Sequence, residues 1–126
     1  GQLCKMVNQI AVVGLLQGLA EAMAFGEQAG LDMERALSVL SKGAARSWQM
    51  DTKGPTMLAR DFQPGFTVNW MLKDLDLVAQ EALRNGAQLP ATRLIQEQFA
   101  KIAAQGHQNL DISALFTLLA HSRDAG

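Results

Sequence analysis

Apolar residues recur every three or four positions along almost the whole chain, which is the spacing of amphipathic α-helices. The segments that share this spacing cover residues 2–29, 32–42, 69–85, 91–105 and 111–121. No segment alternates apolar and polar residues over a length that would indicate a β-strand. The pattern therefore predicts a single all-α domain over residues 1–126, in which about six to seven helices pack around a long N-terminal helix.

Glycines and short polar residues mark the ends of these helices. Three helices are followed by a glycine, which favours the left-handed backbone of a helix end: Gly30, Gly86 and Gly106. Asp32 is expected to cap the second helix, and Asp111 or Ser113 the last one. Most helix boundaries can therefore be predicted to within a few residues.

Residues 43–68 are the least regular part of the chain. Ser47 is expected to cap a short helix that contains Trp48, and the Gly54–Pro55 pair is expected to break that helix. Pro64–Gly65 has the composition of a turn. Because loops between rigid helices often carry ligand contacts, this region is also a candidate for binding.

The periodicity also predicts which side chains face the core. Leu40 and Leu77 are expected to point inward. The apolar run Ile10–Leu16 is expected to be buried nearly all round, inside the domain or at an interface. Four aromatic residues are interpreted first as core: Trp48, Phe62, Phe66 and Trp70. Phe62 and Phe66 flank a polar turn, so the wall of a pocket is the alternative for these two.

Composition and charge narrow the classes of function. The 126 residues are 48% hydrophobic and 18% charged, with a net charge of −1. This balance indicates a globular domain and gives no electrostatic footprint for nucleic acid or an anionic membrane. The run Ile10–Leu16 is too short to span a bilayer, which takes about 20 apolar residues. A lone cysteine, Cys4, allows no internal disulfide, so we expect a reducing, cytoplasmic location.

Lys5 and Asn8 are the leading candidates for chemistry. Residues three apart lie on the same face of a helix, so the ammonium of Lys5 and the amide of Asn8 can converge on one small ligand. A cation beside an amide suits a site that holds a carbonyl oxygen and gives it a proton. Apolar neighbours, Leu3 and Val7 among them, are expected to place the stem of Lys5 beside buried surface. A solvated surface lysine is the alternative.

Lys73 and Asp74 are the second candidate pair. Adjacent helix positions point in different directions, so these two charges are not expected to neutralise each other fully. An exposed charged edge on an amphipathic helix is the alternative. His107 and His121 have no partner at metal-ligand spacing and are expected at the surface, so no metal site is predicted.

Five stretches in order carry a resemblance to a known family. They are Gly1–Asn8, Glu21–Ala22 with Gly30–Asp32, Asp61–Phe66, Leu72–Leu75, and Pro90 with Asp111–Ser113. The first looks like the end of a G-x-G-x-x-x-K-x-x-N motif, and the third and fourth are similar to a D-F-x-P-G-F…K-D-L signature. Together they resemble the C-terminal helical domain of the β-hydroxyacid dehydrogenases, the family of 3-hydroxyisobutyrate dehydrogenase and tartronate semialdehyde reductase.

The resemblance implies roles for individual residues. Lys5 matches the catalytic lysine and Asn8 the substrate-binding asparagine, while the second asparagine of the family is Gln9 here. Lys73, Asp74 and Phe66 match positions at the nicotinamide cofactor and the active site. The implied fold is that of the C-terminal domain of 6-phosphogluconate dehydrogenase, and the implied cofactor is NAD or NADP.

The resemblance also implies what lies outside the chain and what the whole protein does. The family places a Rossmann domain, which binds most of the cofactor, before this segment. The implied reaction transfers hydride between the nicotinamide and a small 3-hydroxy acid or semialdehyde, in a homodimer or higher homo-oligomer. We expect the isolated chain to be inactive. A non-catalytic helical module that serves only for oligomerisation is the alternative.

Overall fold

Helices form most of the part of the chain that the structure, a computed structural model, describes, residues 1–120. The elements in chain order are α1 (Gln2–Gln28), α2 (Met33–Leu40), α3 (Trp48–Ala59), α4 (Val68–Asn85), α5 (Pro90–Ala104) and the 3₁₀-helix η1 (Ile112–Leu118). Within residues 1–120 the extended structure is limited to one isolated bridge between Thr67 and Asp111. The prediction of an all-α fold is confirmed.

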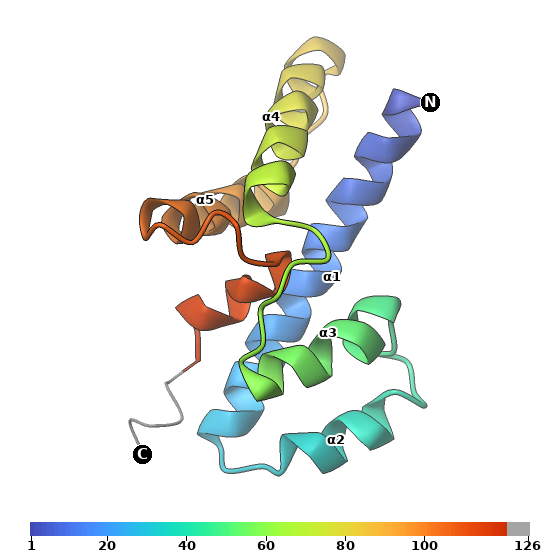
Figure 1. Cartoon of the computed structure of the whole chain (residues 1–126). Helices are drawn as coiled ribbons and strands as arrows, with labels where there is room; N and C mark the ends of the chain where they lie inside the picture. Colours follow the sequence, from blue (N-terminus) through green and yellow to red (C-terminus); the bar gives the residue numbers. More distant parts are fainter. Residues whose placement is uncertain (121–126) are drawn as a thin grey trace.

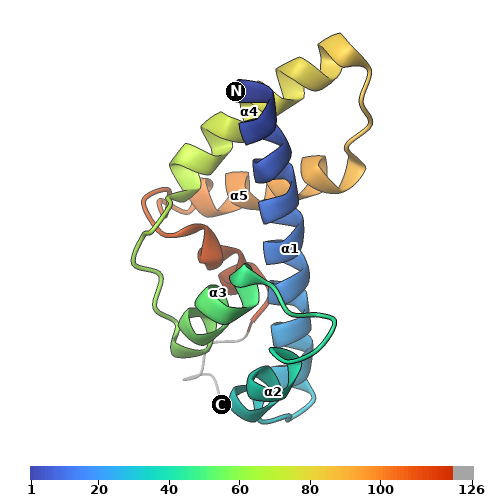
Figure 2. The same ribbon diagram turned by 90° about the vertical axis from the view of Figure 1, so that its right-hand side faces the viewer.

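The long helix α1 organises the domain. It packs against each of the other five helices, so the prediction of a bundle around the N-terminal helix is confirmed. Figure 1 shows α2 and α3 at the C-terminal end of α1, with α4 and α5 toward its N-terminal end. Seen from the side in Figure 2, α3 and η1 lie on the same side of α1. The core fills the space between these elements.

One face of α1 supplies the centre of the core. Its buried side chains include Val13, Leu16 and Met23, which belong to the same cluster as Phe99 of α5 and Phe116 of η1. The other sides of this helix are exposed, as Leu15 and several of its neighbours show. The expectation that Ile10–Leu16 is buried nearly all round inside the domain is therefore wrong, because elements pack against only one side of the helix. Burial at an interface, the alternative, stays a prediction.

By length and composition, α1 is also apolar enough to cross a membrane, with a mean hydropathy of 1.4 over 18 residues. Core helices of globular domains pass the same test. The packing of all five other helices against α1 accounts for its apolar character on one side. This packing does not account for the apolar residues on the exposed side of α1.

Most helix ends lie where the sequence placed them. Asp32 caps α2 by accepting a hydrogen bond from the Arg35 amide, at 3.3 Å. The predicted glycines Gly30, Gly86 and Gly106 all have positive φ. Asp111, rather than Ser113, caps the last helix, which is a 3₁₀-helix ending at Leu118. The predicted end near His121 lies outside the described residues.

The prediction that Gly54–Pro55 breaks a helix is wrong. Ser47 caps α3 as expected, but the helix continues through both residues to Ala59. Gly54 is there for packing, because a Cβ at this position would lie 3.0 Å from Cδ1 of Leu37 on α2. Pro55 lies on the exposed side of α3. Proline has no N–H, so the carbonyl one turn earlier in the helix lacks its usual donor, and water can bond it instead.

Several large side chains predicted to face inward are exposed. They are Leu40, Leu77, Trp48 and Trp70. Leu40 is the last residue of α2, beyond its contact with α3. Leu77 borders a cavity between α1 and α4, and Trp70 lies beneath the ammonium of Lys73. Phe62 and Phe66, by contrast, are partly buried and pack against the core, as predicted.

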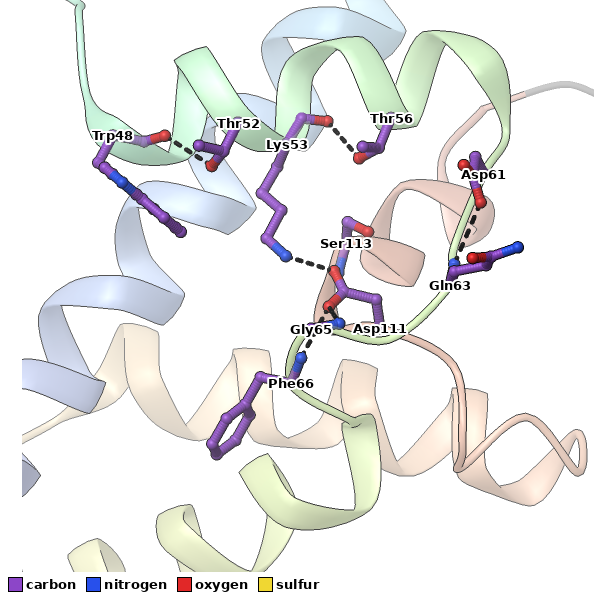
Figure 3. Close-up of polar contacts among 10 residues, drawn as sticks. All are labelled: Trp48, Thr52, Lys53, Thr56, Asp61, Gln63, Gly65, Phe66, Asp111 and Ser113. Carbon is purple, nitrogen blue, oxygen red and sulfur yellow. Dashed lines mark hydrogen bonds and ion pairs between the residues drawn. The ribbon is translucent and has the colours of Figure 1, made fainter.

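A buried carboxylate holds the irregular loop of residues 61–67 against the helices (Figure 3). Oδ1 of Asp111 accepts hydrogen bonds from the amides of Gly65 and Phe66, at 2.9 and 3.0 Å. Oδ2 accepts from the ammonium of Lys53 on α3 at 2.9 Å and from the amide of Ser113 at 3.0 Å. One side chain thus joins α3, the loop and η1.

These hydrogen bonds set the pKa of Asp111. Burial by itself raises the pKa of this carboxyl group, but the hydrogen bonds from Phe66, Lys53 and Ser113 outweigh burial and lower it to about 2. The carboxylate is therefore charged in the folded protein down to strongly acidic pH.

We expect this group to make folding sensitive to acid. Its pKa is about 2 in the folded chain and about 3.9 when unfolded. The unfolded state thus binds the proton first as the pH falls. The free energy of unfolding should drop by about 2–3 kcal/mol between pH ~5 and pH ~2 from this group alone. Urea unfolding measured across this pH range checks the prediction.

Asp111→Asn provides the matched comparison. The variant should be less stable than the parent at neutral pH and should lose this share of the acid dependence. Asp61→Asn, at an exposed position in the same loop, should leave both unchanged. An unaltered pH dependence in Asp111→Asn would contradict the assignment.

Candidate functional site

Lys5 and Asp74 meet where the N-terminal part of α1 faces α4. Nζ of Lys5 lies 3.7 Å from Oδ1 of Asp74. The Lys5 side chain is 65% exposed, whereas that of Asp74 is 13% exposed. The structure therefore pairs a predicted catalytic residue with a predicted cofactor-site residue from a distant part of the chain, and leaves the ammonium open to solvent.

Gln9 connects this pair to Asn8. Nε2 of Gln9 donates to Oδ2 of Asp74 at 2.9 Å, and Oε1 of Gln9 accepts from Nδ2 of Asn8 at 3.1 Å. Gln9 is itself buried. A chain of polar contacts thus runs from Asn8 through Gln9 and Asp74 to Lys5. We call these four residues the α1–α4 cluster.

Gln9 was not predicted as a site residue. The signal was present, because Gln9 follows Lys5 by four positions and residues four apart share a helix face. The bonding partner on α4 is what a single sequence does not reveal.

A small cavity opens beside the α1–α4 cluster. Its volume is about 140 Å³, and its lining residues are Gln2, Lys5, Met6, Gln9, Asp74 and Leu77. The lining combines apolar side chains with an ammonium, an amide and a carboxylate. Such a surface can hold the polar end of a small molecule and present a proton donor to it.

The surroundings of Lys5 differ from the prediction. Of its apolar neighbours, Leu3 and Val7 are exposed, whereas Met6 and Ile10 are half-buried. The first turns of α1 extend beyond the core, and only one side of them contacts α4. What positions the ammonium is the Asp74 carboxylate rather than apolar burial.

The two remaining predicted cofactor residues lie outside the α1–α4 cluster. Nζ of Lys73 lies 4.8 Å from the centre of the Trp70 ring, a cation–π arrangement, whereas Asp74 contacts Lys5 and Gln9. Phe66 lies in the loop bound by Asp111 (Figure 3). The expectation that Lys73 and Asp74 point in different directions is confirmed.

A larger cavity of about 740 Å³ lies between α2 and α3. None of the predicted site residues lines it. Its charged lining residues are Glu27, Asp32, Glu34 and Asp51. Glu27 is paired with Arg60 at 2.7 Å and Asp51 with Arg46 at 3.3 Å, and Asp32 caps α2. The α1–α4 cluster is therefore where the structure brings predicted site residues together.

Metal chemistry finds no support in the part of the chain that is described. Over residues 1–120 there is no group of three or more histidine, cysteine, aspartate or glutamate side chains that could hold a metal ion. His107 is exposed, as predicted, and the predicted surface position of His121 falls outside the described residues.

Comparison with known proteins gives a consistent result. Residues 1–119 match the family described as "NAD-binding of NADP-dependent 3-hydroxyisobutyrate dehydrogenase". An uncharacterised oxidoreductase of Shewanella frigidimarina is 44% identical over 98% of this chain and 42% of its own length. The 2-hydroxy-3-oxopropionate reductase of Escherichia coli is 40% identical over 94% of this chain and 41% of its own length.

The fold is shared with a solved structure of the same family. The 3-hydroxyisobutyrate dehydrogenase of Mycobacterium tuberculosis, solved with L-serine, aligns with a TM-score of 0.87 at 29% identity, covering 96% of this chain and 44% of that one. The chain thus spans about two-fifths of the length of the curated relatives given above.

The Gln9–Asp74 hydrogen bond gives a prediction about stability. Gln9→Leu removes a donor from a mostly buried carboxylate, so the free energy of unfolding should fall by about 1–2 kcal/mol. Gln80→Leu, at an exposed position on α4, should change it by less than ~0.5 kcal/mol. Chemical unfolding of the two variants beside the parent is the measurement. Equal effects in both would show that the Gln9–Asp74 contact does not stabilise the fold.

Proposed function

Because the chain belongs to the 3-hydroxyisobutyrate dehydrogenase family, we propose that it is the substrate-side domain of an NAD(P)-dependent 3-hydroxyacid dehydrogenase. The observation that carries the proposal is the α1–α4 cluster, in which the solvent-accessible ammonium of Lys5 lies 3.7 Å from the carboxylate of Asp74. A positioned, accessible ammonium is a suitable general acid for carbonyl reduction.

Lys5 has one role in each direction of the reaction. In reduction, its N–H donates a proton to the substrate oxygen while the carbonyl carbon accepts a hydride. In oxidation, the neutral amine takes the hydroxyl proton while the hydride leaves carbon. The contact with Asp74 keeps the nitrogen at one place on the surface of α1 in both directions.

Asn8 and Gln9 orient the substrate and the acid–base pair. The amide of Asn8 lies three residues from Lys5, on the same helix face, and contributes one hydrogen bond to a substrate oxygen. Gln9 fixes both neighbours at once, since it bonds Asn8 on one side and Asp74 on the other. Holding the groups in place before substrate arrives reduces the reorganisation needed for catalysis.

The proposed reaction also requires a binding site for the nicotinamide cofactor. Proteins of this family use NAD or NADP, which supplies or accepts the hydride when bound. Residues 1–120 contain no β-α-β unit to cradle a dinucleotide. The donor set beside the cavity fits only the reacting end of the cofactor and the substrate. In the proposal, Lys73 and Phe66 extend this contact toward the nicotinamide, and another part of the full-length protein binds the rest.

The substrate class follows from the relatives and from the size of the site. One relative is named for reducing 2-hydroxy-3-oxopropionate and another for acting on 3-hydroxyisobutyrate. A cavity of about 140 Å³ accommodates a molecule of this small size. We therefore propose a small 3-hydroxy acid or its semialdehyde as substrate. The location that we propose is the cytoplasm, which differs from that of an Arabidopsis relative named as mitochondrial.

A helical module that only mediates oligomerisation is the alternative proposal, and the exposed apolar side of α1 is the observation that favours it. Oligomerisation alone, however, gives no reason for a buried glutamine that connects Asn8 to a lysine–aspartate pair. The two proposals are compatible, because the apolar side and the α1–α4 cluster occupy different sides of the helix.

Replacement of Lys5 tests the catalytic proposal. In the full-length protein, Lys5→Ala should lower kcat by about 10²–10⁴-fold, because the proton transfer loses its acid–base group. Affinity for NAD(P)H, measured by fluorescence titration, should stay unchanged. Lys101→Ala, at an exposed position on α5, should retain parental kcat.

Two outcomes would argue against the proposal. If Lys5→Ala retained full turnover, Lys5 would not be the acid–base residue. If the purified 126-residue chain turned over NAD(P)H by itself, the division of labour between this domain and a separate cofactor domain would be wrong.

A further inference from the structure

Trp70 is a large aromatic side chain that the core does not use. It lies in the first turn of α4, where its amide donates to the hydroxyl of Thr67 at 3.1 Å, and it is 57% exposed. An exposed indole gives up the stability that its burial would contribute. The ring instead lies under the ammonium of Lys73, whose Nζ is 4.8 Å from the ring centre. Trp70 therefore contributes to the surroundings of Lys73 rather than to the core.

Lys73 has no carboxylate partner in the described part of the chain, residues 1–120. The two aspartates that follow it on α4 are already engaged. Asp74 contacts α1, and Asp76 accepts a hydrogen bond from Gln96 of α5 at 2.8 Å. The first turn of α4 contains no acidic residue, and the positive end of the helix dipole, which precedes Lys73, does not attract a cation. The ammonium thus has no opposite charge close to it.

An aromatic ring holds a cation differently from a carboxylate. The face of an indole attracts an ammonium by about 0.5–1 kcal/mol at an exposed site, although the ring carries no net charge. A carboxylate would neutralise the ammonium and occupy its N–H groups with charge-assisted hydrogen bonds. Over the ring, Lys73 is held in one place while its positive charge stays available. Its N–H groups on the side away from the ring can still donate to a ligand.

The Trp70–Lys73 pair borders the α1–α4 cluster. Trp70 precedes Asp74 by four positions, so the indole and this carboxylate lie one turn apart on the same face of α4. Asp74 is the residue that contacts the ammonium of Lys5. An uncompensated charge one turn from the proposed acid–base group suits an electron-rich oxygen of a ligand bound there.

We infer that Trp70 is a positioning residue for Lys73, whose ammonium it holds in place, charged and unpaired, for an oxygen of the cofactor or of the substrate. The inference rests on the proposed function, in which Lys73 extends the contact toward the nicotinamide. Trp70 does not itself touch the reacting atoms. It reduces the conformational entropy that the long side chain of Lys73 loses when the ligand binds.

Trp70→Leu in the full-length protein removes the ring and keeps an apolar side chain. The Kd of NADPH or NADH, titrated by nucleotide fluorescence, should rise about 2–5-fold if the cofactor supplies the oxygen, as expected for a loss of ~0.5–1 kcal/mol. If the substrate supplies it, the same rise should appear in KM alone. KM is measured with 2-hydroxy-3-oxopropionate or 3-hydroxyisobutyrate, the compounds for which two relatives are named. In both cases kcat should change by less than about 2-fold, because Trp70 takes no part in the proton transfer.

Two further variants show whether the ring itself is responsible. Trp70→Phe keeps an aromatic face and should recover most of the lost affinity. Leu83→Ala, which removes an 88% exposed apolar side chain from the same helix, should leave Kd, KM and kcat at the parental values.

Trp70→Glu separates the positioning of Lys73 from an effect on folding. It places a carboxylate three residues before Lys73, where the two side chains can form an ion pair. The carboxylate competes with the ligand for the ammonium, so binding should weaken more than in Trp70→Leu. A glutamate in the first turn of a helix favours folding through the helix dipole. Urea unfolding should therefore show at least parental stability together with the loss of affinity.

A double-mutant cycle and an NMR signal test the contact directly. Lys73→Met should raise the same constant as Trp70→Leu, and the addition of Trp70→Leu to Lys73→Met should have no further effect. In protein labelled with ¹³C at lysine Cε, the Lys73 signal is the one that Lys73→Met removes. The ring current of the indole should shift this signal upfield in the parent, and Trp70→Leu should return it to the position of exposed lysines. This second measurement does not depend on activity.

Four results would overturn the inference, and they distinguish it from the proposed function. If Lys73→Met changed neither Kd nor KM, the proposed contact of Lys73 would be wrong, and the role of Trp70 with it. If Lys73→Met raised either constant and Trp70→Leu did not, the contact would stand and the role of Trp70 alone would be wrong. Tighter binding by Trp70→Leu would show that the ring competes with the ligand for the ammonium. An unshifted Lys73 signal in the parent would show that the ring does not hold the ammonium in solution.

Discussion

The carboxylate of Asp111 connects three parts of the chain, the loop before α4, α3 and η1. Backbone hydrogen bonds join this loop to residues 110–112, and two further amides of the loop donate to a single oxygen of the aspartate. The other oxygen holds an ammonium from α3 and the first turn of η1. Because four donors converge on it, the charge remains inside the fold despite its burial. The loop held by this carboxylate leads directly into α4, the helix that carries Asp74.

The sequence predicted where the helices begin and end better than which of their side chains are exposed. Caps such as Asp32 and stops such as Gly86 act within a few residues, so local chemistry is enough to place them. Gly54–Pro55 misled the prediction because the role of Gly54 depends on Leu37, a contact between two helices. Trp70 was assigned to the core for a similar reason: hydrophobicity alone does not show that an aromatic ring lies under a lysine.

The candidate site shows the same division. Lys5 and Asp74 were identified one by one, from spacing and from resemblance, and the structure brings them together across 69 positions of the chain. Gln9 and Lys53 were missed because each matters through a partner distant in sequence, at 65 and 58 positions. A single sequence records the residue types of such pairs but not their encounter. Short-range spacing thus identifies individual residues of a site, whereas the tertiary fold determines which of them meet.

The length of α1 has a mechanical consequence. The helix extends about 40 Å, with its middle fixed in the core and its first turns, which carry Lys5, beyond it. A tilt of about 5° about the middle of the helix therefore moves Lys5, which lies about 15 Å along the axis from that point, by ~1.3 Å. Displacements of this size are enough to separate a proton donor from its acceptor. Stiff packing around Val13 and Leu16 thus fixes the position of the Lys5 ammonium two to three turns away.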